Sequence, residues 1–432
     1  MGRGFRFGFI FILLFSLILS ACSEGSGSGA RGESKDEKVV LDFQTFWGSE
    51  TRKPVIEKIV SDFNKSQDQI EVKHTFVPWG DIWTKNTAAV AAGNPADVIV
   101  NDIFTVAVRA ENGQTEDLTK YLSENLKNKL YPNLWESGLY QNKVYGVPFI
   151  TDNRLLFYNK DAYKEAGLDP EKPPTTWHEL EEHAKKLDVK KGNSYERIGY
   201  YPLWGSFGAS SWMSNADDGE GYFEDGKVNF ATANKIEGLE WVAGWQKRLG
   251  QKNIQAFEAE FGNGQTNPFI SGKVAIWTDT ANFYTQIRDS KTDINFGIAP
   301  IPAFKEGGRN WNEGGGFVME VPKGSDHPKE AAKFIEYLTS DKVQKYWAEK
   351  NFDNVANKNA ADSVVDGLEG DGKMVYESAV NNLKDTPFHT VPVKYPDYKS
   401  IVDPIIDNAI QGKISPEQAL KKAEKDVKKS EK

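Results

Sequence analysis

Cysteine is nearly absent from this chain. The 432 residues contain one cysteine, Cys22, so no intramolecular disulfide can form. Histidine is also scarce, and its five copies are scattered; His178 and His183 miss the i,i+4 spacing of a helical zinc pair. The segment Asp217-Asp218-Gly219-Glu220 lacks the alternate spacing of a calcium loop and predicts a surface turn. We therefore expect neither a metal site nor a bound cofactor.

A surplus of positive charge is missing as well. The net charge is −9 and the isoelectric point is about 5.4. Nucleic-acid phosphates are bound by clustered lysines and arginines, so we do not expect nucleic acid as a partner. The sequence has no Gly-x-x-x-x-Gly-Lys-Ser/Thr phosphate loop. We therefore expect no ATPase site of this type in the chain.

Long apolar runs are limited to one near the start. Phe7 to Leu19 is shorter than the roughly 20 residues of a membrane-spanning helix, and Arg3 and Arg6 precede it. From residue 39 onward, no run of 18 or more apolar residues occurs. Residues 1–21 are therefore interpreted as an export signal.

The signal ends in Leu19-Ser20-Ala21-Cys22, which resembles a bacterial lipoprotein box. That resemblance implies cleavage after residue 21 and a diacylglycerol on Cys22, and two acyl chains hold a protein stably to a bilayer. The alternative is an ordinary cleaved signal with a chance cysteine. Residues 22–38 are rich in glycine, serine and charged side chains, so we expect a flexible tether there.

Aromatic side chains, by contrast, are abundant, with 12 Trp, 16 Tyr and 25 Phe. Many of them must be core residues, but twelve indoles exceed what packing requires. A sugar ring presents an apolar face of axial hydrogens, and a flat ring with a polar edge suits that face. The aromatic content is therefore compatible with a carbohydrate ligand.

Apolar periodicity predicts that strands and helices alternate after residue 39. This alternation predicts an α/β fold with a mostly parallel sheet, and the chain length predicts two domains of roughly 150 to 200 residues. Thr176 to Glu179 has the spacing of a helix capping box, and Ser415-Pro416 marks another helix start. The predicted strands cover residues 39–46, 70–76, 97–100, 144–150, 154–158, 270–277 and 294–301, and the predicted helices include 55–63, 81–92 and 331–338.

A set of segments occurs in a characteristic order along the chain, at residues 91–100, 144–169, 269–277, 296–304, 314–340 and 401–428. Together these segments resemble the extracellular solute-binding proteins of bacterial ABC importers, in the cluster that carries mono- and oligosaccharides. The resemblance implies an α/β, two-lobe periplasmic-binding-protein fold of type II, with a ligand cleft between the lobes. Three segments would cross between the lobes, near residues 148–154, 303–309 and 351–357. The first lobe would comprise residues 39–150 and 304–352, and the second lobe residues 151–303 and 353–432.

The same resemblance implies a binding protein without catalytic residues. It would capture a mono- or oligosaccharide and deliver it to the transmembrane permease subunits of an importer that a separate ATPase powers. We expect a monomer that a lipid anchor holds to the outer face of the cell membrane. Two alternatives remain open: a secreted glycoside hydrolase, which would need a pair of carboxylates at the scissile bond, and a binding protein for a solute other than a sugar.

Ligands of α/β sheets sit beyond the carboxyl ends of strands, so the loops after strand-like runs are candidate contacts. Asp152 falls at the first crossing, where the resemblance places a carboxylate that faces the cleft. An ionised carboxylate can accept hydrogen bonds from two sugar hydroxyls. The alternative for the acids is a role in a turn or a helix cap. The predicted ligand contacts are Trp47, Glu50, Asp81, Asn101, Asp102, Asp152, Trp204, Trp277, Asp279, Trp311, Gly315 and Tyr398.

Among the aromatic candidates, Trp204 and Trp277 are the first choices for stacking on a sugar, with core packing as the alternative. Trp79 and Trp83 are further candidates. The chain departs from the family after Trp277, because residues 279–282 (DTAN) stand where the family commonly has Gly and Trp. For Gly315, the alternative to close approach of the ligand is a simple turn.

Overall fold

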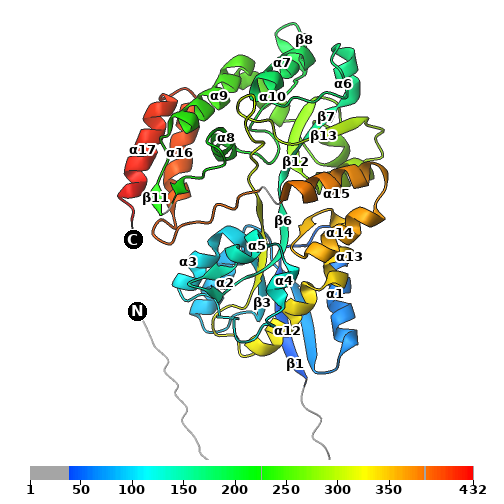
Figure 1. Cartoon of the computed structure of the whole chain (residues 1–432), viewed down its shortest axis with the longest axis vertical. Helices are drawn as coiled ribbons and strands as arrows, with labels where there is room; N and C mark the ends of the chain where they lie inside the picture. Colours follow the sequence, from blue (N-terminus) through cyan, green and yellow to red (C-terminus); the bar gives the residue numbers. More distant parts are fainter. Residues whose placement is uncertain (1–37, 225, 384–385, 432) are drawn as a thin grey trace, which may run out of the picture. The chain divides into compact units, whose positions relative to one another are not determined.

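The structure is a computed structural model that describes residues 38–224, 226–383 and 386–431 (Figure 1). Cys22, the predicted signal at residues 1–21 and nearly all of the predicted tether at residues 22–38 lie outside these ranges. Within the described residues, no helix combines the length and the apolar character that crossing a bilayer requires. The described chain forms two hydrophobic cores, each built on its own β-sheet.

The first core surrounds a six-stranded sheet with the order β15-β6-β14-β3-β1-β2. β1 is parallel to β2 and β3, whereas β14 is antiparallel to β3 and β6, and β15 is antiparallel to β6. The prediction of a mostly parallel sheet is therefore wrong. Helical connections make β1, β2 and β3 parallel, but β14 enters between β3 and β6 after the chain returns from the second core. The strands are β1 (Val39–Thr45), β2 (Ile70–Phe76), β3 (Val98–Asp102), β6 (Val147–Asp152), β14 (Gly315–Glu320) and β15 (Asn354–Val355).

Helices pack on this sheet through apolar faces of helical spacing. α1 buries five side chains between Val55 and Phe63, as the periodicity predicts. α12 begins at Pro328, whose missing N–H has no partner to lose at that position. The helices that contribute to the first core are α1 (Arg52–Ser66), α2 (Ile82–Ala91), η1 (Ile103–Thr105), α3 (Val106–Glu111), α4 (Leu126–Lys129), α5 (Pro132–Ser137), α12 (Pro328–Leu338), α13 (Asp341–Asn351) and α14 (Lys358–Gly367).

The second core surrounds a three-stranded antiparallel sheet with the order β12-β7-β13. The strand predicted over residues 270–277 is displaced, because residues 268–272 form turns and β12 begins only at Ile276. Asn267 Oδ1 accepts the N–H groups of Phe269 and Ile270, and this side-chain turn replaces strand pairing. The elements are β7 (Arg154–Asn159), α6 (Lys160–Glu165), α7 (Trp177–Leu187), α8 (Ala209–Ala216), α9 (Ala233–Leu249), α10 (Gln251–Glu258), β12 (Ile276–Thr280), α11 (Phe283–Asp289), β13 (Phe296–Ala299), α16 (Tyr398–Ile410) and α17 (Pro416–Lys428).

Helix caps and short hairpins complete the described chain. Thr176 Oγ1 accepts the Glu179 N–H at 3.2 Å, which confirms the predicted cap. The Glu179 carboxylate does not close the box, because it accepts the N–H and the hydroxyl of Thr175 instead. Ser415 and Gln418 form a complete capping box at the start of α17. The short elements are β4 (Leu139–Tyr140), β5 (Lys143–Val144), β8 (Val189–Lys191), β9 (Ser194–Arg197), β10 (Phe223–Glu224), β11 (Lys227–Val228) and η2 (Gly264–Thr266).

Three stretches of chain join the two cores. Asn153 alone separates β6 of the first sheet from β7 of the second, and residues 300–314 lead from β13 back to β14 (Figure 1). The third stretch includes α15 (Gly370–Leu383), which places Tyr376 in the first core and Val375 in the second. Residues 354–364 pack in the first core. We propose that the last boundary between the two lobes lies within α15, because this helix contributes side chains to both cores.

Candidate functional site

The first candidate group lies where β6 becomes β7. Asp152 ends β6 and pairs in the sheet with Gly315, and Arg154 begins β7. Arg154 Nη1 donates to Asp152 Oδ1 at 2.5 Å, and these side chains are only 19% and 26% exposed. A Cβ at position 315 would lie 3.0 Å from Asp152 Oδ1, so glycine gives the carboxylate its room. The crossing thus holds a half-buried carboxylate in a charge-assisted hydrogen bond.

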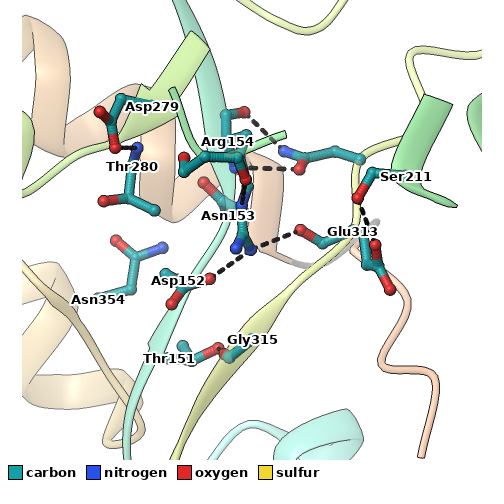
Figure 2. A network of polar contacts seen from close by, with 12 residues as sticks. Thr151, Asp152, Asn153, Arg154, Ser211, Asp279, Thr280, Glu313, Gly315 and Asn354 are labelled. Atoms are coloured by element: carbon teal, nitrogen blue, oxygen red, sulfur yellow. Dashed lines mark hydrogen bonds and ion pairs between the residues drawn. The ribbon is translucent and has the colours of Figure 1, made fainter. Parts of the chain in front are cut away.

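Arg154 also connects this carboxylate to the second stretch between the cores. Its Nη1 donates to the Glu313 carbonyl oxygen at 3.0 Å, and its Nε donates to the Ser206 carbonyl oxygen at 2.9 Å (Figure 2). The Asn312 side chain forms two hydrogen bonds with the Arg154 backbone. Its Nδ2 donates to the Arg154 carbonyl oxygen at 2.7 Å, and its Oδ1 accepts the Arg154 N–H at 2.9 Å. The guanidinium, and with it Asp152, is therefore fixed in place.

Glu313 supplies a second carboxylate in the same region. Ser211 Oγ, on α8, donates to Glu313 Oε2 at 2.5 Å (Figure 2). The sequence prediction did not include Glu313. The available signal was its position two residues before Gly315, which was predicted to allow close approach of a ligand.

The end of β3 carries two predicted contacts, Asn101 and Asp102, and they differ. Asn101 is 1% exposed, and its Nδ2 donates to Glu320 Oε2 at 2.9 Å. Arg109 Nε donates to the same Glu320 oxygen at 2.8 Å. The side chain of Asn101 therefore belongs to a buried network that supports the sheet.

Asp102, in contrast, lines a cavity that the start of α16 also lines. Its Oδ1 accepts the Phe104 N–H at 2.7 Å and caps η1, so the cap role that was the alternative for the acids is present here. Burial raises the pKa of Asp102 and the nearby Asp152 charge adds to this shift, while Arg109 opposes it. Asp102 Oδ2 forms no hydrogen bond with the residues that the structure describes, so it can accept a ligand hydroxyl.

A cavity of about 350 Å³, here called the first cavity, opens beside Glu313. Phe104, which packs against both cores, lines one wall, and Tyr222, Tyr398 and residues of α8 and α9 line the others. The segment 388–392, which connects α15 to α16, closes a further side. The ionisable side chains around it, apart from the tyrosines, are Glu220, Lys235, Glu313, His389, Lys399 and Asp403.

Lys235 is fully buried and lines the first cavity. Its Nζ lies 2.5 Å from Asp217 Oδ2, which also accepts the Thr232 hydroxyl at 2.9 Å. The predicted surface turn is present at residues 217–220, where Asp218 and Glu220 are exposed. The Asp217 carboxylate is directed to Lys235, because an unpaired buried ammonium is strongly destabilising.

His389 fixes the connecting segment against α8. Its Nε2 lies 3.2 Å from Ser214 Oγ, and the ring packs against Gly221, where a Cβ would approach within 2.7 Å of Nδ1. Burial lowers the pKa of His389, although Glu313 and Glu220 oppose this shift, so the ring is neutral at pH 7.

A second cavity, of about 440 Å³, adjoins the first and shares Phe104 and Lys399 with it. Asp102 and Trp83 line it from the first core, and the start of α16 lines it from the second. Both cavities therefore lie between elements of the two cores.

An aromatic cluster stands at the carboxyl ends of β1 and β2, on the same edge of the sheet as Asp102. Trp79 is 52% exposed, and its ring centroid lies 4.6 Å from those of Phe46 and Trp83 and 5.6 Å from that of Phe317. We call Phe46, Trp79, Trp83 and Phe317 the aromatic platform. Its exposed indole is available to a ligand ring.

The first-choice tryptophans are buried instead. Trp204 is 5% exposed, lies 5.0 Å from Phe261 between ring centroids, and donates from Nε1 to Glu258 at 3.0 Å. Trp277 is also buried, and its Nε1 donates to Asp279 Oδ2 at 2.9 Å. Trp47 packs 4.4 Å from Trp347 in the first core. Trp204 and Trp277 therefore occupy the packing position that was the alternative, and Trp47 is also a core residue.

The remaining predicted contacts are dispersed. Glu50 and Asp81 are exposed, and Asp81 pairs with Lys85 one helical turn along α2. Burial raises the pKa of Asp279, whose oxygens accept from Trp277 Nε1 and the Thr280 N–H. Trp311 stacks with Arg309 at 4.3 Å. Tyr398 and Glu313, which the sequence prediction did not include, line the first cavity, and Asp102 lines the second. Asp152 and Gly315 line neither cavity, but Arg154 links Asp152 to the Glu313 carbonyl oxygen.

Within the described residues, no group of three or more His, Cys, Asp and Glu side chains is arranged to hold a metal ion. The carboxylates of the site are instead bonded to arginine, serine and backbone N–H groups. Such an arrangement can accept hydrogen bonds from ligand hydroxyl or N–H groups.

Comparisons with known proteins agree with this architecture. The profile described as bacterial extracellular solute-binding protein matches residues 47–345. The multiple sugar-binding protein of Streptococcus mutans is 26% identical over 351 residues, which are 77% of this chain and 78% of that protein. The sn-glycerol-3-phosphate-binding periplasmic protein UgpB of Escherichia coli is 27% identical over 306 residues, which are 66% of this chain and 67% of that protein.

Solved structures extend the likeness to the fold. CpMnBP1 with mannotriose bound is 26% identical and aligns with a TM-score of 0.79 over 90% of this chain and 100% of that chain. Maltose-bound MalE3 of T. maritima is 21% identical and aligns with a TM-score of 0.74 over 90% of this chain and 99% of that chain. These matches confirm the predicted two-lobe α/β fold of type II. The family profile covers more than half of the sequence, and the chain belongs to the family of bacterial extracellular solute-binding proteins.

Proposed function

We propose that this protein is the carbohydrate-binding component of an ABC importer and not an enzyme. The observation that carries the proposal is Asp152, a half-buried carboxylate that Arg154 fixes at the crossing between the two cores. A fixed carboxylate accepts hydrogen bonds from sugar hydroxyls without first having to be ordered. The two cavities lined by elements of both cores provide the volume for one or more sugar rings.

The aromatic platform supports a carbohydrate over a small polar solute. Trp79 offers an exposed indole face beside Phe46, at the sheet edge that also carries Asp102. An apolar face next to hydrogen-bonding acids matches a sugar ring, which has an apolar face and a polar rim. The relatives that are named for sugars or were solved with mannotriose point to the same ligand class.

A phosphorylated solute is the second candidate, because UgpB is named for sn-glycerol-3-phosphate. A phosphate would need a cation that is not already neutralised. Arg154 is paired with Asp152, and Lys235 is paired with Asp217. Carboxylates outnumber the remaining lysine around the first cavity, so its charge disfavours an anion.

A screen of thermal stability tests this proposal. Neutral mono-, di- and oligosaccharides should raise the melting temperature, because a ligand at 100 times its dissociation constant adds about 2.7 kcal/mol to stability. The same samples, analysed after incubation, should contain intact sugar. Stabilisation by sn-glycerol-3-phosphate alone would contradict carbohydrate binding, and cleaved oligosaccharide would identify a glycoside hydrolase instead.

We further propose that the protein is a monomer and that a diacylglycerol on Cys22 anchors it to the outer face of the cell membrane. There it delivers its ligand to the permease subunits of an importer that a separate ATPase powers. The support is the Leu19-Ser20-Ala21-Cys22 sequence and the polar stretch that follows it. Cys22→Ser should release a folded protein from the membrane fraction. A variant that stays with the membrane would contradict the anchor.

A further inference from the structure

The first cavity carries unpaired negative charge. Glu220, Glu313 and Asp403 line it, and among the described residues none of the three has an ion-pair partner. Of the two lysines that line it, Lys235 is neutralised by Asp217 at 2.5 Å. Lys399 is exposed, and its Nζ lies 5.7 Å from the centroid of the Phe104 ring. Three carboxylates therefore face one unpaired ammonium group.

The innermost of these carboxylates is bonded but not neutralised. Glu313 is half-buried, whereas Glu220 and Asp403 stand exposed at the rim. Glu313 Oε2 accepts from the Ser211 hydroxyl at 2.5 Å, and a hydroxyl brings no positive charge. A partly buried carboxylate without a cation favours a ligand that supplies one.

The side chain of Tyr222 adds a further polar group to the lining of the first cavity. Tyr222 is 9% exposed and lines the first cavity, and its Oη has no hydrogen-bond partner in the part of the chain that the structure describes. Burial raises the pKa of Tyr222 well above its ordinary value, and the charges of Glu313 and Asp403 add to this shift. The phenol oxygen therefore stays protonated and can accept an N–H from a ligand.

Aromatic rings supply much of the remaining wall. Five line the cavity: Phe104, Tyr222, Phe223, Phe388 and Tyr398. A ring face attracts a cation through its quadrupole, and cages of this kind bind ammonium groups. Carboxylates, an orphaned phenol oxygen and aromatic faces thus surround one volume of about 350 Å³.

We propose that the first cavity binds the protonated amino group of its ligand, so that the preferred carbohydrate is an amino sugar or an oligosaccharide that contains one. This inference rests on the proposed carbohydrate function. A neutral sugar leaves the negative charge of the cavity uncompensated, and an N-acetyl group carries no charge to compensate it. The amino group donates to Glu313 and to Tyr222 Oη.

Matched sugars test the proposal by calorimetric titration of the full-length protein at pH 6. D-glucosamine, D-galactosamine and D-mannosamine are each compared with the hydroxyl parent and the N-acetyl derivative. At least one amino sugar should bind about 10-fold more tightly than both of its counterparts, which is about 1.4 kcal/mol. Equal or tighter binding of the neutral forms, or no binding of any amino sugar, would overturn the proposal. If neutral oligosaccharides still bind, the proposed carbohydrate function stands.

A charge-removing variant assigns the effect to this cavity. Glu313→Gln keeps the shape and the bond to Ser211, and it should reduce the amino-sugar preference to less than about 3-fold. Glu237→Gln is the matched control, because Glu237 is exposed on α9 and does not line the cavity. Both variants should melt near the wild-type temperature. An undiminished preference in Glu313→Gln would overturn the assignment.

Discussion

Two tryptophans with opposite exposure separate ligand stacking from core packing. Trp79→Ala should leave the melting temperature nearly unchanged, because the indole is 52% exposed, and should weaken carbohydrate binding by about 1 to 2 kcal/mol. Trp204→Ala should cost roughly 3 to 5 kcal/mol of stability and leave the affinity of the folded fraction intact. Urea denaturation and calorimetric titration measure the two effects. The reverse outcome, with a stable Trp204 variant that no longer binds, would restore Trp204 as a ligand contact.

The raised pKa of Asp102 has a consequence for stability. A carboxyl whose folded-state pKa lies above the ordinary 3.8 is destabilising when ionised, and this penalty develops as the pH rises above 3.8 and is complete above the folded-state pKa. Asp102→Asn keeps an oxygen for the Phe104 N–H and removes the charge. The variant should therefore exceed wild type in free energy of unfolding at pH 7, with the difference disappearing below pH 3.8. An advantage that grows toward low pH would contradict the burial argument.

At the residue scale, the sequence predicted where a side chain stands relative to the strands better than which side chain it bonds to. Asn101 and Asp102 do end a strand, but the chain gave no sign that Glu320, more than two hundred residues away, holds the Asn101 amide. Trp204 and Trp277 are of the residue type that stacks on sugars, but both are buried in the second core. Glu258 and Asp279 accept their indole N–H groups, so this burial leaves no donor unsatisfied. Arg154 and Glu313 were missed because their roles depend on contacts between distant segments.

At the scale of elements, Asp353 joins three of them where α13 ends. Asp353 is buried, and it accepts from Arg52 Nη2 at 2.8 Å, Asn282 Nδ2 at 2.9 Å and Trp347 Nε1 at 2.9 Å. Arg52 begins α1 of the first core, and Asn282 precedes α11 of the second. Asn282 belongs to the DTAN segment that departs from the family pattern, so this departure has a structural role.

Removal of that acceptor should be strongly destabilising. Asp353→Ala leaves a guanidinium and two N–H donors without a partner, and we expect a loss of about 3 to 5 kcal/mol in the free energy of unfolding. Asn282→Ala removes one donor and leaves the ion pair, so it should cost only about 1 kcal/mol. Chemical denaturation gives both values. A loss below 1 kcal/mol for Asp353→Ala would show that the three bonds are not formed together.

The elements themselves were predictable where the signal is local. Helix α1 follows from its apolar spacing, and the Thr176 cap follows from one hydroxyl and the next turn of backbone. Strand direction is not local: β14 is antiparallel to β3 because the chain returns from the second core. The displaced start of β12 depends on the Asn267 turn, which apolar alternation alone does not reveal.

At the scale of the whole molecule, a ligand between the two cores should change the dimensions of the protein. Hinge closure around a ligand is known for two-lobe binding proteins. Small-angle scattering should give a smaller radius of gyration with a bound oligosaccharide than without it. A control with a sugar that does not bind should leave the radius unchanged. An unchanged radius with a ligand proven to bind would indicate a rigid, preformed site.

The most direct test of the central claim is calorimetric titration of wild type and Asp152→Asn with the oligosaccharides that stabilise the protein. Arg154 keeps its bonds to Ser206 and Glu313, so Asp152→Asn should fold. We predict one site per chain in wild type and affinity at least about 10-fold lower in Asp152→Asn, because the charge-assisted bonds to ligand hydroxyls are weakened. Equal affinity of the two proteins, with unchanged melting curves, would contradict the site proposed here.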